Sequence, residues 1–388
     1  MKGPLSGLKA VELQGRGPGP FGAMMLADLG ADVVRIVRPQ DVSADAGESG
    51  TERMIRGHRR IDLVARGRRS VAVDLKQPDG RTTVLRLVDG ADVLLEGFRP
   101  GVAERLGVGP DACLERNPRL VYARITGWGQ DGPYAHTPGH DINYVALAGA
   151  LDPLRRGGEA PAPPLNLLGD YGGGGMLLVV GILSALVERS LSGRGQVVDA
   201  AMIDGVALLT TIVHGMRAQG LWSDAPGSNV LDLGAPFYNV YETADGRHVT
   251  VGSGEPQFYA ELLERLGLGD ELLRQQSDPA TWTDGKARLA AVFKTRPLDE
   301  WRELLEGTDT CFAPVLTLAE APAHPHNVSR RTFVEVDGVV QPAPAPSSAS
   351  TSARASCDRL PPSRLTPDRT SDRGKDGGDR RDTSRRDR

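Results

Sequence analysis

The stretch KAVELQGRGPGPFGAMMLADLGADVVRIV, residues 9–37, contains a β-branched run, a glycine-rich turn, an apolar helical segment and a second β-branched run. It predicts a strand at 9–13, a helix at 21–29 and a strand at 32–37. Two strands joined through a helix form a βαβ unit, in which the strands lie parallel in one sheet.

The same alternation continues outward from this stretch to about residue 130. Further strands are predicted at 70–74, 93–96 and 120–125, and helices at 81–88 and 102–106. The runs VVRIV and LVYARI are almost continuously apolar, as expected for strands that are covered on both faces. The first part of the chain is therefore predicted to be an α/β domain built on a parallel sheet.

The remainder of the chain predicts three further regions. Residues 127–175 are rich in Gly, Pro, Asn and Asp, which predicts a long functional loop, followed by a helix at 176–190, a strand at 196–198 and a helix at 200–214. A hairpin around Asp245-Gly246 and helices at 256–266, 286–294 and 299–305 predict a small α+β domain. We place the large domain at 1–224, the small domain at 225–325, a return segment at 326–345 and a tail at 346–388.

The composition limits the classes of function. The 388 residues are 39% hydrophobic with a formal net charge of −4, which provides no overall basic surface for nucleic acid or membrane. The three cysteines, Cys113, Cys311 and Cys357, form no CxxC pair, so we expect no disulfide framework, no metal site and a reducing cytoplasm. There is no signal-like apolar run at the N-terminus, and residues 176–187 are too short to span a bilayer.

The tail has a composition that cannot form a core. After Val340 the only large aliphatic residues are Leu360 and Leu365, among Ser, Pro, Arg and Asp. Such a segment buries too little surface to offset its chain entropy, so we predict disorder. Its arginines would also suit a nucleic-acid arm, but the interleaved aspartates favour an inert solvated tail.

The sequence Gly17-Pro-Gly-Pro-Phe-Gly22 matches the GxGxxG pattern of dinucleotide sites. Pro18 and Pro20 remove N–H donors that would bind a pyrophosphate, and the second strand ends at Arg38 where an NAD enzyme would have an acid. A tight glycine turn with close backbone approach accounts for the same residues. We favour that interpretation over a nicotinamide site.

Two candidate bases lie in the segment 127–175. His140, in the sequence GHDINY (139–144), precedes an apolar segment, and a helix N-terminus there would keep the imidazole neutral and basic. Alternatively, His140 and Asp141 only cap that helix.

Asp170 precedes four glycines, which would let backbone N–H groups approach a ligand, for example an enolate. The alternative is that Asp170 is an N-cap before a flexible turn. Together the two residues would offer one base to each face of a planar intermediate, as racemisation requires.

At these residues the chain resembles the α-methylacyl-CoA racemases within the class III CoA-transferases. The resemblance covers about residues 1–345 and includes ADLGADVVRIVRP, EGFRPGVAERLGVGP, TGWGQDGP, GHDINY and PPLNLLGDYGGGG. It implies a doubly wound parallel-sheet large domain, a small α+β domain and an interlocked homodimer, whose active site lies between one subunit's large domain and the other's small domain.

The resemblance also implies roles for individual residues. His140 would act on the (S)-acyl-CoA and Asp170 on the (R)-form, with Glu255 of the partner subunit and Asn166 as supporting groups. The CoA-binding segments would be Arg38, Val73, Asp74, Leu75, Lys76, Gly97, Phe98, Arg99, Arg105, Gly139, His140, Asp141, Ile142, Asn143 and Tyr144. Arg and Lys suit phosphates. Without the family motif, Arg105 would be interpreted as a solvated helix residue.

The chain departs from the family pattern in two places. It has extra residues around QDVSADAGESGTER (40–53), near the predicted CoA site, and it leaves the pattern abruptly after the segment QPAPAP (341–346), as an out-of-frame C-terminus would. The second departure could weaken dimer closure.

Three functions remain open from the sequence. The first is a 2-methylacyl-CoA racemase that uses no metal and no cofactor beyond the CoA of its substrate. The second is a CoA-transferase in which Asp170 attacks the thioester carbonyl. The third is a CoA-binding protein without catalytic activity. A transferase has no obvious use for His140, so the histidine favours the racemase.

Overall fold

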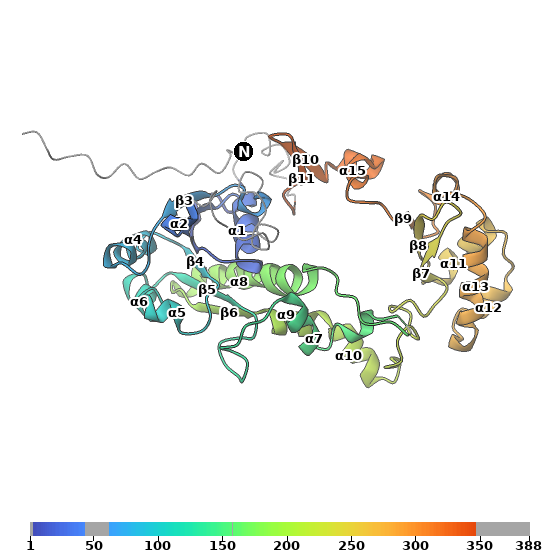
Figure 1. Cartoon of the computed structure of the whole chain (residues 1–388), viewed down its shortest axis with the longest axis horizontal. Coiled ribbons are helices and arrows are strands. Elements are labelled where there is room, and N and C mark those ends of the chain that lie inside the picture. The colour runs from blue at the N-terminus through green and yellow to red at the C-terminus, as the bar shows by residue number, and fades with distance from the viewer. Residues whose placement is uncertain (1–2, 43–61, 157, 347–388) are drawn as a thin grey trace, which may run out of the picture.

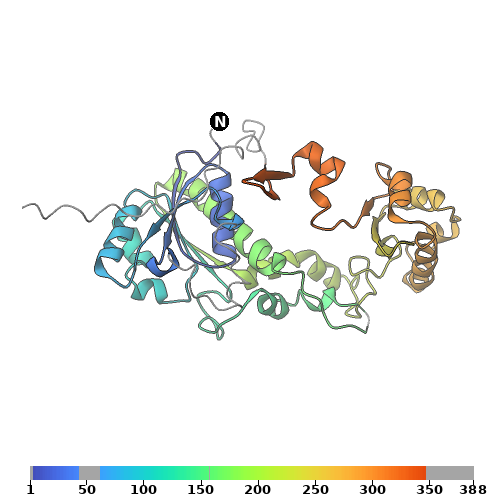
Figure 2. The ribbon, with the colours of Figure 1, turned by 45° about the horizontal axis from the view of Figure 1, so that its top comes forward.

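The structure is a computed structural model that describes residues 3–42, 62–156 and 158–346. Figures 1 and 2 show a large lobe at one end and a small lobe at the other, joined by two separate connections. One connection follows α10, and the other runs from β9 through α15 back to the large lobe.

The large lobe is built on a six-stranded sheet in the order β3-β2-β1-β4-β5-β6, in which all neighbouring strands are parallel. The strands are β1 (Lys9–Leu13), β2 (Asp32–Val37), β3 (Arg69–Ala72), β4 (Val93–Glu96), β5 (Val121–Thr126) and β6 (Val197–Ala201). The predicted α/β class with a doubly wound parallel sheet is therefore confirmed. The predicted strands at 9–13, 32–37 and 93–96 agree with the structure at both ends.

Helices cover both faces of this sheet. Alternate strand residues face opposite cores: Val93 packs with α1 and α8, whereas its neighbour Leu94 packs with α4 and α6. This double burial explains the continuous apolar runs. The helices of the large lobe are α1 (Pro18–Asp28), α2 (Pro39–Val42), η2 (Leu63–Ala65), α4 (Pro78–Val88), α5 (Val102–Arg105), α6 (Pro110–Arg116), α7 (Asp141–Leu147), η3 (Asp152–Leu154), η4 (Leu167–Met176), α8 (Leu177–Ser192), α9 (Met202–Leu209) and α10 (Thr211–Ala218).

The structure corrects two expectations for this lobe. Residues 127–175 are not one long loop, since they contain α7, η3 and the π-helix η4. The predicted helix at 200–214 is two helices, α9 and α10, which meet at Thr210. A glycine-rich composition favours a loop, but here the glycines allow helices to pack closely.

The segment Leu167–Ser192 is a continuous helical run of 26 residues that is long and apolar enough to cross a membrane. The expected apolar stretch at 176–187 is therefore only part of a longer helical run. Within this run Leu178, Val179 and Ile182 are buried against the sheet and α1. The criterion is one of length and composition, which the core helix of a globular domain also meets.

The small lobe has an antiparallel sheet, β7 (Tyr238–Glu242), β8 (His248–Gly252) and β9 (Phe312–Pro314), with several helices packed against it. The β7–β8 pairing confirms the predicted hairpin. Its core contains the aromatic side chains Tyr241, Tyr259, Phe293 and Trp301. The helices are α11 (Pro256–Arg265), α12 (Glu271–Arg274), η5 (Pro279–Thr281), α13 (Trp282–Phe293), α14 (Leu298–Leu305) and η6 (Ala321–Ala323).

The chain then returns to the large lobe through α15 (Pro325–Arg330) and the hairpin β10 (Phe333–Val336) and β11 (Val339–Pro342). Arg66 holds this hairpin: its guanidinium donates to the Pro342 carbonyl at 2.8 Å and to the Asp28 carboxylate at 2.6 Å. The predicted tail after residue 346 and most of the predicted insertion at 40–53 lie outside the described residues.

Candidate active site

The predicted CoA segments follow successive strands of the parallel sheet. Arg38 follows β2, residues 73–76 follow β3, and residues 97–99 follow β4. Because all strands are parallel, these segments share the carboxyl edge of the sheet, where ligands of such folds bind. The strand order reverses between β1 and β4, so the turn after β4 lies at the switch point of the sheet.

A buried ion pair shapes the turn Gly97–Arg99. Glu96, 2% exposed at the end of β4, accepts a hydrogen bond from the Phe98 N–H at 2.7 Å and one from Arg124 Nε at 2.9 Å. Burial raises the pKa of Glu96, and these two partners oppose that rise. Arg124 also pairs with Glu104 at 2.8 Å. The turn and the first residues of α5 therefore depend on the same arginine.

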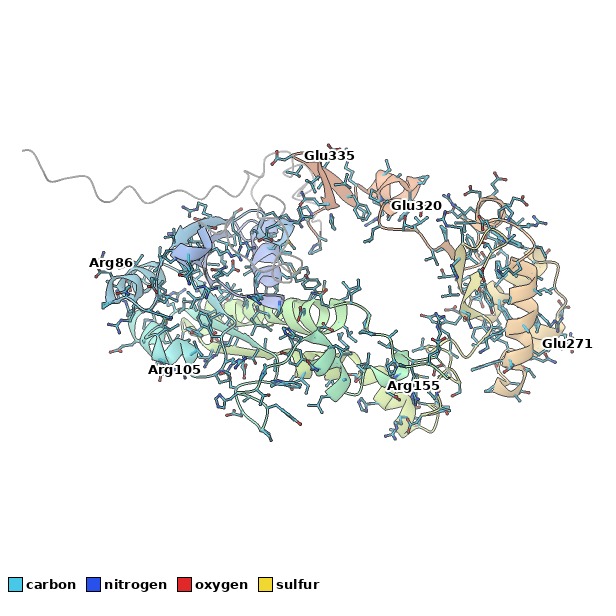
Figure 3. All side chains as sticks on the ribbon, viewed as in Figure 1. Arg86, Arg105, Arg155, Glu271, Glu320 and Glu335 are labelled. Atoms are coloured by element: carbon cyan, nitrogen blue, oxygen red, sulfur yellow. The ribbon has the colours of Figure 1, made fainter. Side chains whose placement is uncertain are left out.

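The segments after β2 and β3 are fixed mainly through their backbones. The Arg38 N–H donates to Gln14 Oε1 at 3.1 Å, and the Val73 N–H donates to the Val37 carbonyl at 2.8 Å. Asp74 accepts the Lys76 N–H at 3.0 Å, so its carboxylate organises its own turn. Val73 is buried and Leu75 is half-buried. Four of the predicted residues in these segments, in the turn after β4 and in α5 are exposed and basic: Arg38, Lys76, Arg99 and Arg105, the last labelled in Figure 3.

His140 is the N-cap of α7, as the sequence predicts, and its side chain is exposed. The His140 N–H donates to Asn143 Oδ1 at 3.0 Å. Tyr144 packs edge-on against Trp128 at 4.6 Å and occupies the space where a side chain at Gly127 would lie. This contact places the helix on the turn after β5, at the same edge of the sheet as the basic side chains.

Tyr144 connects α7 electrostatically to its surroundings. Burial, together with the negative charge of Asp170, raises the pKa of Tyr144 to about 12. The positive charge of Arg99 partly offsets this rise. Arg99 and Asp170 therefore both lie within electrostatic range of this helix. The exposed Ile142 and Asn143 occupy the first turn of α7, next to the half-buried Gly139.

Asp170 lies within the π-helix η4, so it is not an N-cap. Asn166 Nδ2 donates to Asp170 Oδ2 at 3.2 Å. Burial raises the pKa of Asp170, the Asn166 hydrogen bond lowers it, the charge of Asp141 raises it and the charge of His140 lowers it. The Asp170 N–H donates to Asp141 Oδ2 at 2.6 Å, so Asp170 lies beside the residue that follows His140. A π-helix is rare and often marks a functional site, but the sequence offered no sign of it.

The four glycines after Asp170 have a different use from the predicted one. They lie in helical backbone, and Gly173, Gly174 and Gly175 are buried. A Cβ atom on Gly173 would come within 2.7 Å of the Val206 amide nitrogen, and one on Gly175 within 2.7 Å of the Phe21 ring. Their missing side chains thus allow η4 to pack against α9 and α1, and do not expose N–H groups to a ligand.

Gly17 in the GxGxxG sequence lies beside Asp170. It is the N-cap of α1 with φ +61°, and a Cβ atom there would come within 2.8 Å of Asp170 Oδ2. The tight-turn interpretation is supported, and the close approach serves a side chain of the protein. Neither Gly17 nor the carboxylate of Asp141 was singled out for such a role from the sequence.

Glu255 is the exposed N-cap of α11 in the small lobe, whereas His140 begins α7 in the large lobe (Figure 1). Among the described residues, no hydrogen bond or ion pair joins Glu255 to His140. Within one chain the structure therefore does not bring these two predicted partners together.

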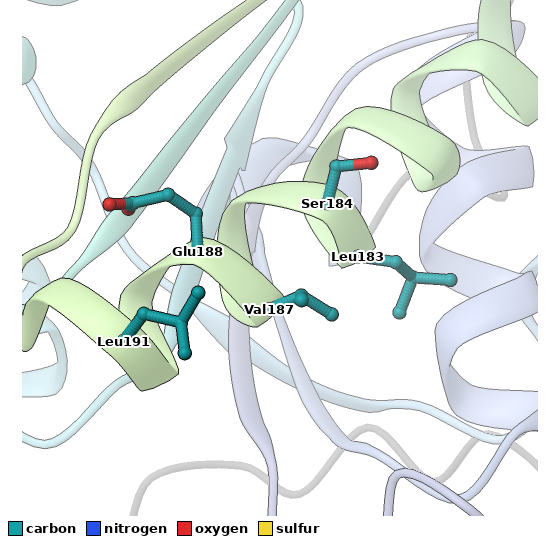
Figure 4. A pocket seen from close by; sticks show the side chains of 5 residues that line it. All are labelled: Leu183, Ser184, Val187, Glu188 and Leu191. Carbon is teal, nitrogen blue, oxygen red and sulfur yellow. The ribbon is translucent and has the colours of Figure 1, made fainter.

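Two other features lie apart from these residues. In the described ranges, no group of three or more His, Cys, Asp or Glu side chains is placed to hold a metal ion. A shallow hollow lies on α8 and is lined by Leu183, Ser184, Val187, Glu188 and Leu191 (Figure 4). These residues belong to the later turns of α8, whereas Asp170 precedes the helix.

Comparisons with known proteins agree on one family. The sequence model of CoA-transferase family III matches residues 5–365. An alpha-methylacyl-CoA racemase of Mus musculus is 47% identical, over 92% of this chain and 90% of its own length, and one of Homo sapiens is 44% identical over the same shares. The crystal structure of a CAIB/BAIF family protein from Brucella suis superposes with a TM-score of 0.75 and 27% identity, over 95% of this chain and 97% of its own.

Proposed function

The chain belongs to CoA-transferase family III, and we propose that it is a racemase that interconverts (R)- and (S)-2-methylacyl-CoA thioesters. The main support is the placement of two candidate bases at the carboxyl edge of the sheet, beside exposed basic side chains: Asp170 is hydrogen-bonded to Asp141, the residue that follows His140. The names of the mouse and human relatives point to the same reaction.

In the proposed mechanism one base removes the α-proton and the other returns a proton from the opposite face. With the (S)-thioester, His140 takes the proton and the C–H electron pair passes into the enolate. Asp170, protonated, then gives its proton to the α-carbon and the (R)-thioester forms. The reverse reaction begins with ionised Asp170. A carboxylate whose pKa is raised by burial is a stronger base near neutral pH than an exposed one.

The CoA moiety of the substrate carries the anionic groups that the protein recognises. We propose that its phosphates bind near the exposed cations Arg38, Lys76, Arg99 and Arg105, with adenine against the strand-end backbone. No cofactor beyond the substrate's own CoA and no metal is required, because both transferred protons have a protein base.

We also propose that the active protein is an interlocked homodimer, in which Glu255 of the partner subunit supports His140. The exposed apolar side chains Val180, Leu191, Leu208 and Ile212 on α8, α9 and α10 support a subunit contact. Co-expression of His140→Ala with Glu255→Ala tests it. If Glu255 acts across the interface, a mixed dimer retains one intact site and recovers activity that neither variant has alone. If it acts within one chain, mixing restores nothing.

Incubation of each enantiomer of a 2-methylacyl-CoA with the protein in deuterated water tests the function directly. A racemase incorporates deuterium at the α-carbon while optical purity is lost. The competing function, a CoA-transferase with Asp170 as nucleophile, is favoured by the description of the family and by the names of relatives that are 31–33% identical. It predicts no α-exchange and transfer of CoA to an added carboxylate, which would overturn the racemase.

A further inference from the structure

One carboxylate joins the two candidate bases. Asp141 follows His140 directly in the chain, and its Oδ2 accepts the main-chain N–H of Asp170 at 2.6 Å. The bond is short, as charge-assisted hydrogen bonds are. It connects the first turn of α7 with the middle of the π-helix η4, so the position of one base relative to the other depends on Asp141.

Asp141 differs from the other acids that begin helices in this chain. It is 6% exposed, whereas Asp79, Asp111 and Asp284, in the first turns of α4, α6 and α13, are exposed to solvent. Its second oxygen, Oδ1, is buried without a hydrogen-bond partner within the described part of the chain. Burial of a carboxylate with so few partners is costly. An acid that only stabilised a helix N-terminus would not need to be buried.

The backbone of η4 accommodates this carboxylate. A Cβ atom on Gly169 would come within 2.5 Å of Asp141 Oδ2 and 2.8 Å of its Cγ. Only a glycine at this position lets the carboxylate reach the amide of the next residue. Gly169 is buried as well, so the contact excludes water.

Few charges face Asp170 from the elements packed against η4. Those that act on its carboxyl group are the negative charge of Asp141, which raises its pKa, and the positive charge of His140, which lowers it. The other ionisable side chains on these elements are Tyr144 on α7, Asp204 on α9, Tyr122 and Arg124 on β5, Asp199 on β6, Glu188 and Arg189 in the later turns of α8, and Asp28 at the far end of α1. Asp141 is therefore the main nearby charge that opposes ionisation of Asp170.

We propose that Asp141 is a positioning residue, whose buried carboxylate fixes Asp170 beside His140. Its negative charge should also affect the pH above which Asp170 is ionised and can accept the α-proton. This inference rests on the proposed racemase function. The Asp141 carboxylate itself does not contact the reacting atoms in this role.

The test is the pH dependence of α-deuterium incorporation into the (R)-thioester by wild type and Asp141→Asn. The amide keeps the size and one acceptor oxygen but removes the charge, so the acid limb of the profile should move to lower pH. Asp141→Ala also loses the hydrogen bond and should lower the rate at the pH optimum by about tenfold or more, as misplaced catalytic groups do. Asp284→Asn, which removes a first-turn acid of the small lobe, should leave the profile unchanged.

An unmoved acid limb in folded Asp141→Asn would refute the proposal. If that variant does not fold, Gly169→Ala takes its place, since the added methyl displaces the carboxylate without removing the charge. Gly169→Ala should lower the rate of α-deuterium incorporation into the (R)-thioester about tenfold. Incorporation by this variant at the wild-type rate would also overturn the proposal. Absence of exchange by the wild type itself would instead count against the racemase function.

Discussion

The backbone of Gly17 lies directly against the carboxylate of Asp170, so close that a Cβ atom on Gly17 would come within 2.8 Å of Oδ2. The glycine turn between β1 and α1 thus forms one wall of the candidate site. A sequence pattern that suggests a nucleotide loop serves here to make space for a carboxylate.

Gly17→Ala should therefore reduce activity far more than stability. Alanine at φ +61° and ψ −113° lies outside the left-handed helical region and costs on the order of 1–3 kcal/mol of folding free energy. The added methyl group also displaces the Asp170 carboxylate, and a displacement of about 1 Å can lower kcat on the order of a hundredfold. Gly267→Ala is the matched control, because Gly267 has φ +68° with nothing within 4 Å of an added Cβ. Equal kcat in the two variants, at equal loss of Tm, would show that Gly17 serves only the backbone.

Asn166→Ala should move the acid limb of (R)-thioester exchange to higher pH. Asn166 donates to Asp170 Oδ2, and this bond lowers the pKa of a carboxyl group that burial raises. Without it the carboxyl group stays protonated to a higher pH, and a protonated base cannot remove the α-proton. The pH profile of deuterium incorporation measures the shift. A shift to lower pH would mean that Asn166 does not stabilise the ionised form.

Glu96→Ala should weaken CoA binding more than it slows catalysis. The change removes the acceptor of the Phe98 N–H and leaves Arg124 with Glu104 alone. Loss of one partner of a buried pair costs about 3 kcal/mol of stability, and the turn with Arg99 loses its support. We expect a raised KM for acyl-CoA with a smaller change in kcat. The milder change Glu96→Gln keeps an acceptor oxygen and should keep more of the binding, so equal KM values for the two variants would contradict this role.

Much of the large lobe could be predicted because its strands have a local signal. A strand buried on both faces is mostly apolar along its length, and the predicted bounds of β1, β2 and β4 agree with the structure at both ends. The β7–β8 hairpin was predicted from its Asp245-Gly246 turn. Strand β9 was missed, since three residues that include Pro314 have no such pattern.

The surroundings of Asp170 could not be predicted, because they have no local sequence signal. Four consecutive glycines have a weak helical propensity, and what favours helix there is contact with Val206, Phe21 and Pro18 from distant parts of the chain. The hydrogen bond from Asp170 to Asp141 is likewise a tertiary contact. His140 and Asp170 were identified as residue types, but their proximity depends on packing that no local pattern specifies.

The two described cysteines should differ sharply in reactivity. Cys113 is fully buried and burial raises its pKa to about 12, whereas Cys311 is exposed and its pKa is raised less, by partial burial and the charge of Glu255. Because the thiolate is the reactive form, a maleimide at pH 7.5 should label Cys311 and leave Cys113 unmodified until the protein is unfolded. Mass spectrometry of the two peptides, with and without denaturant, measures this. Rapid native labelling of Cys113 would contradict the packing of α6 on the sheet.

The most direct test of the two-base mechanism is α-proton exchange by His140→Ala and Asp170→Asn with each enantiomer in deuterated water. Loss of a base typically costs a factor of about a hundred to ten thousand, so neither variant should racemise. His140→Ala should still exchange the α-proton of the (R)-thioester through Asp170, with retention of configuration. Asp170→Asn should exchange only that of the (S)-thioester. Near-normal racemisation by either variant, or exchange of the same enantiomer by both, would contradict the account.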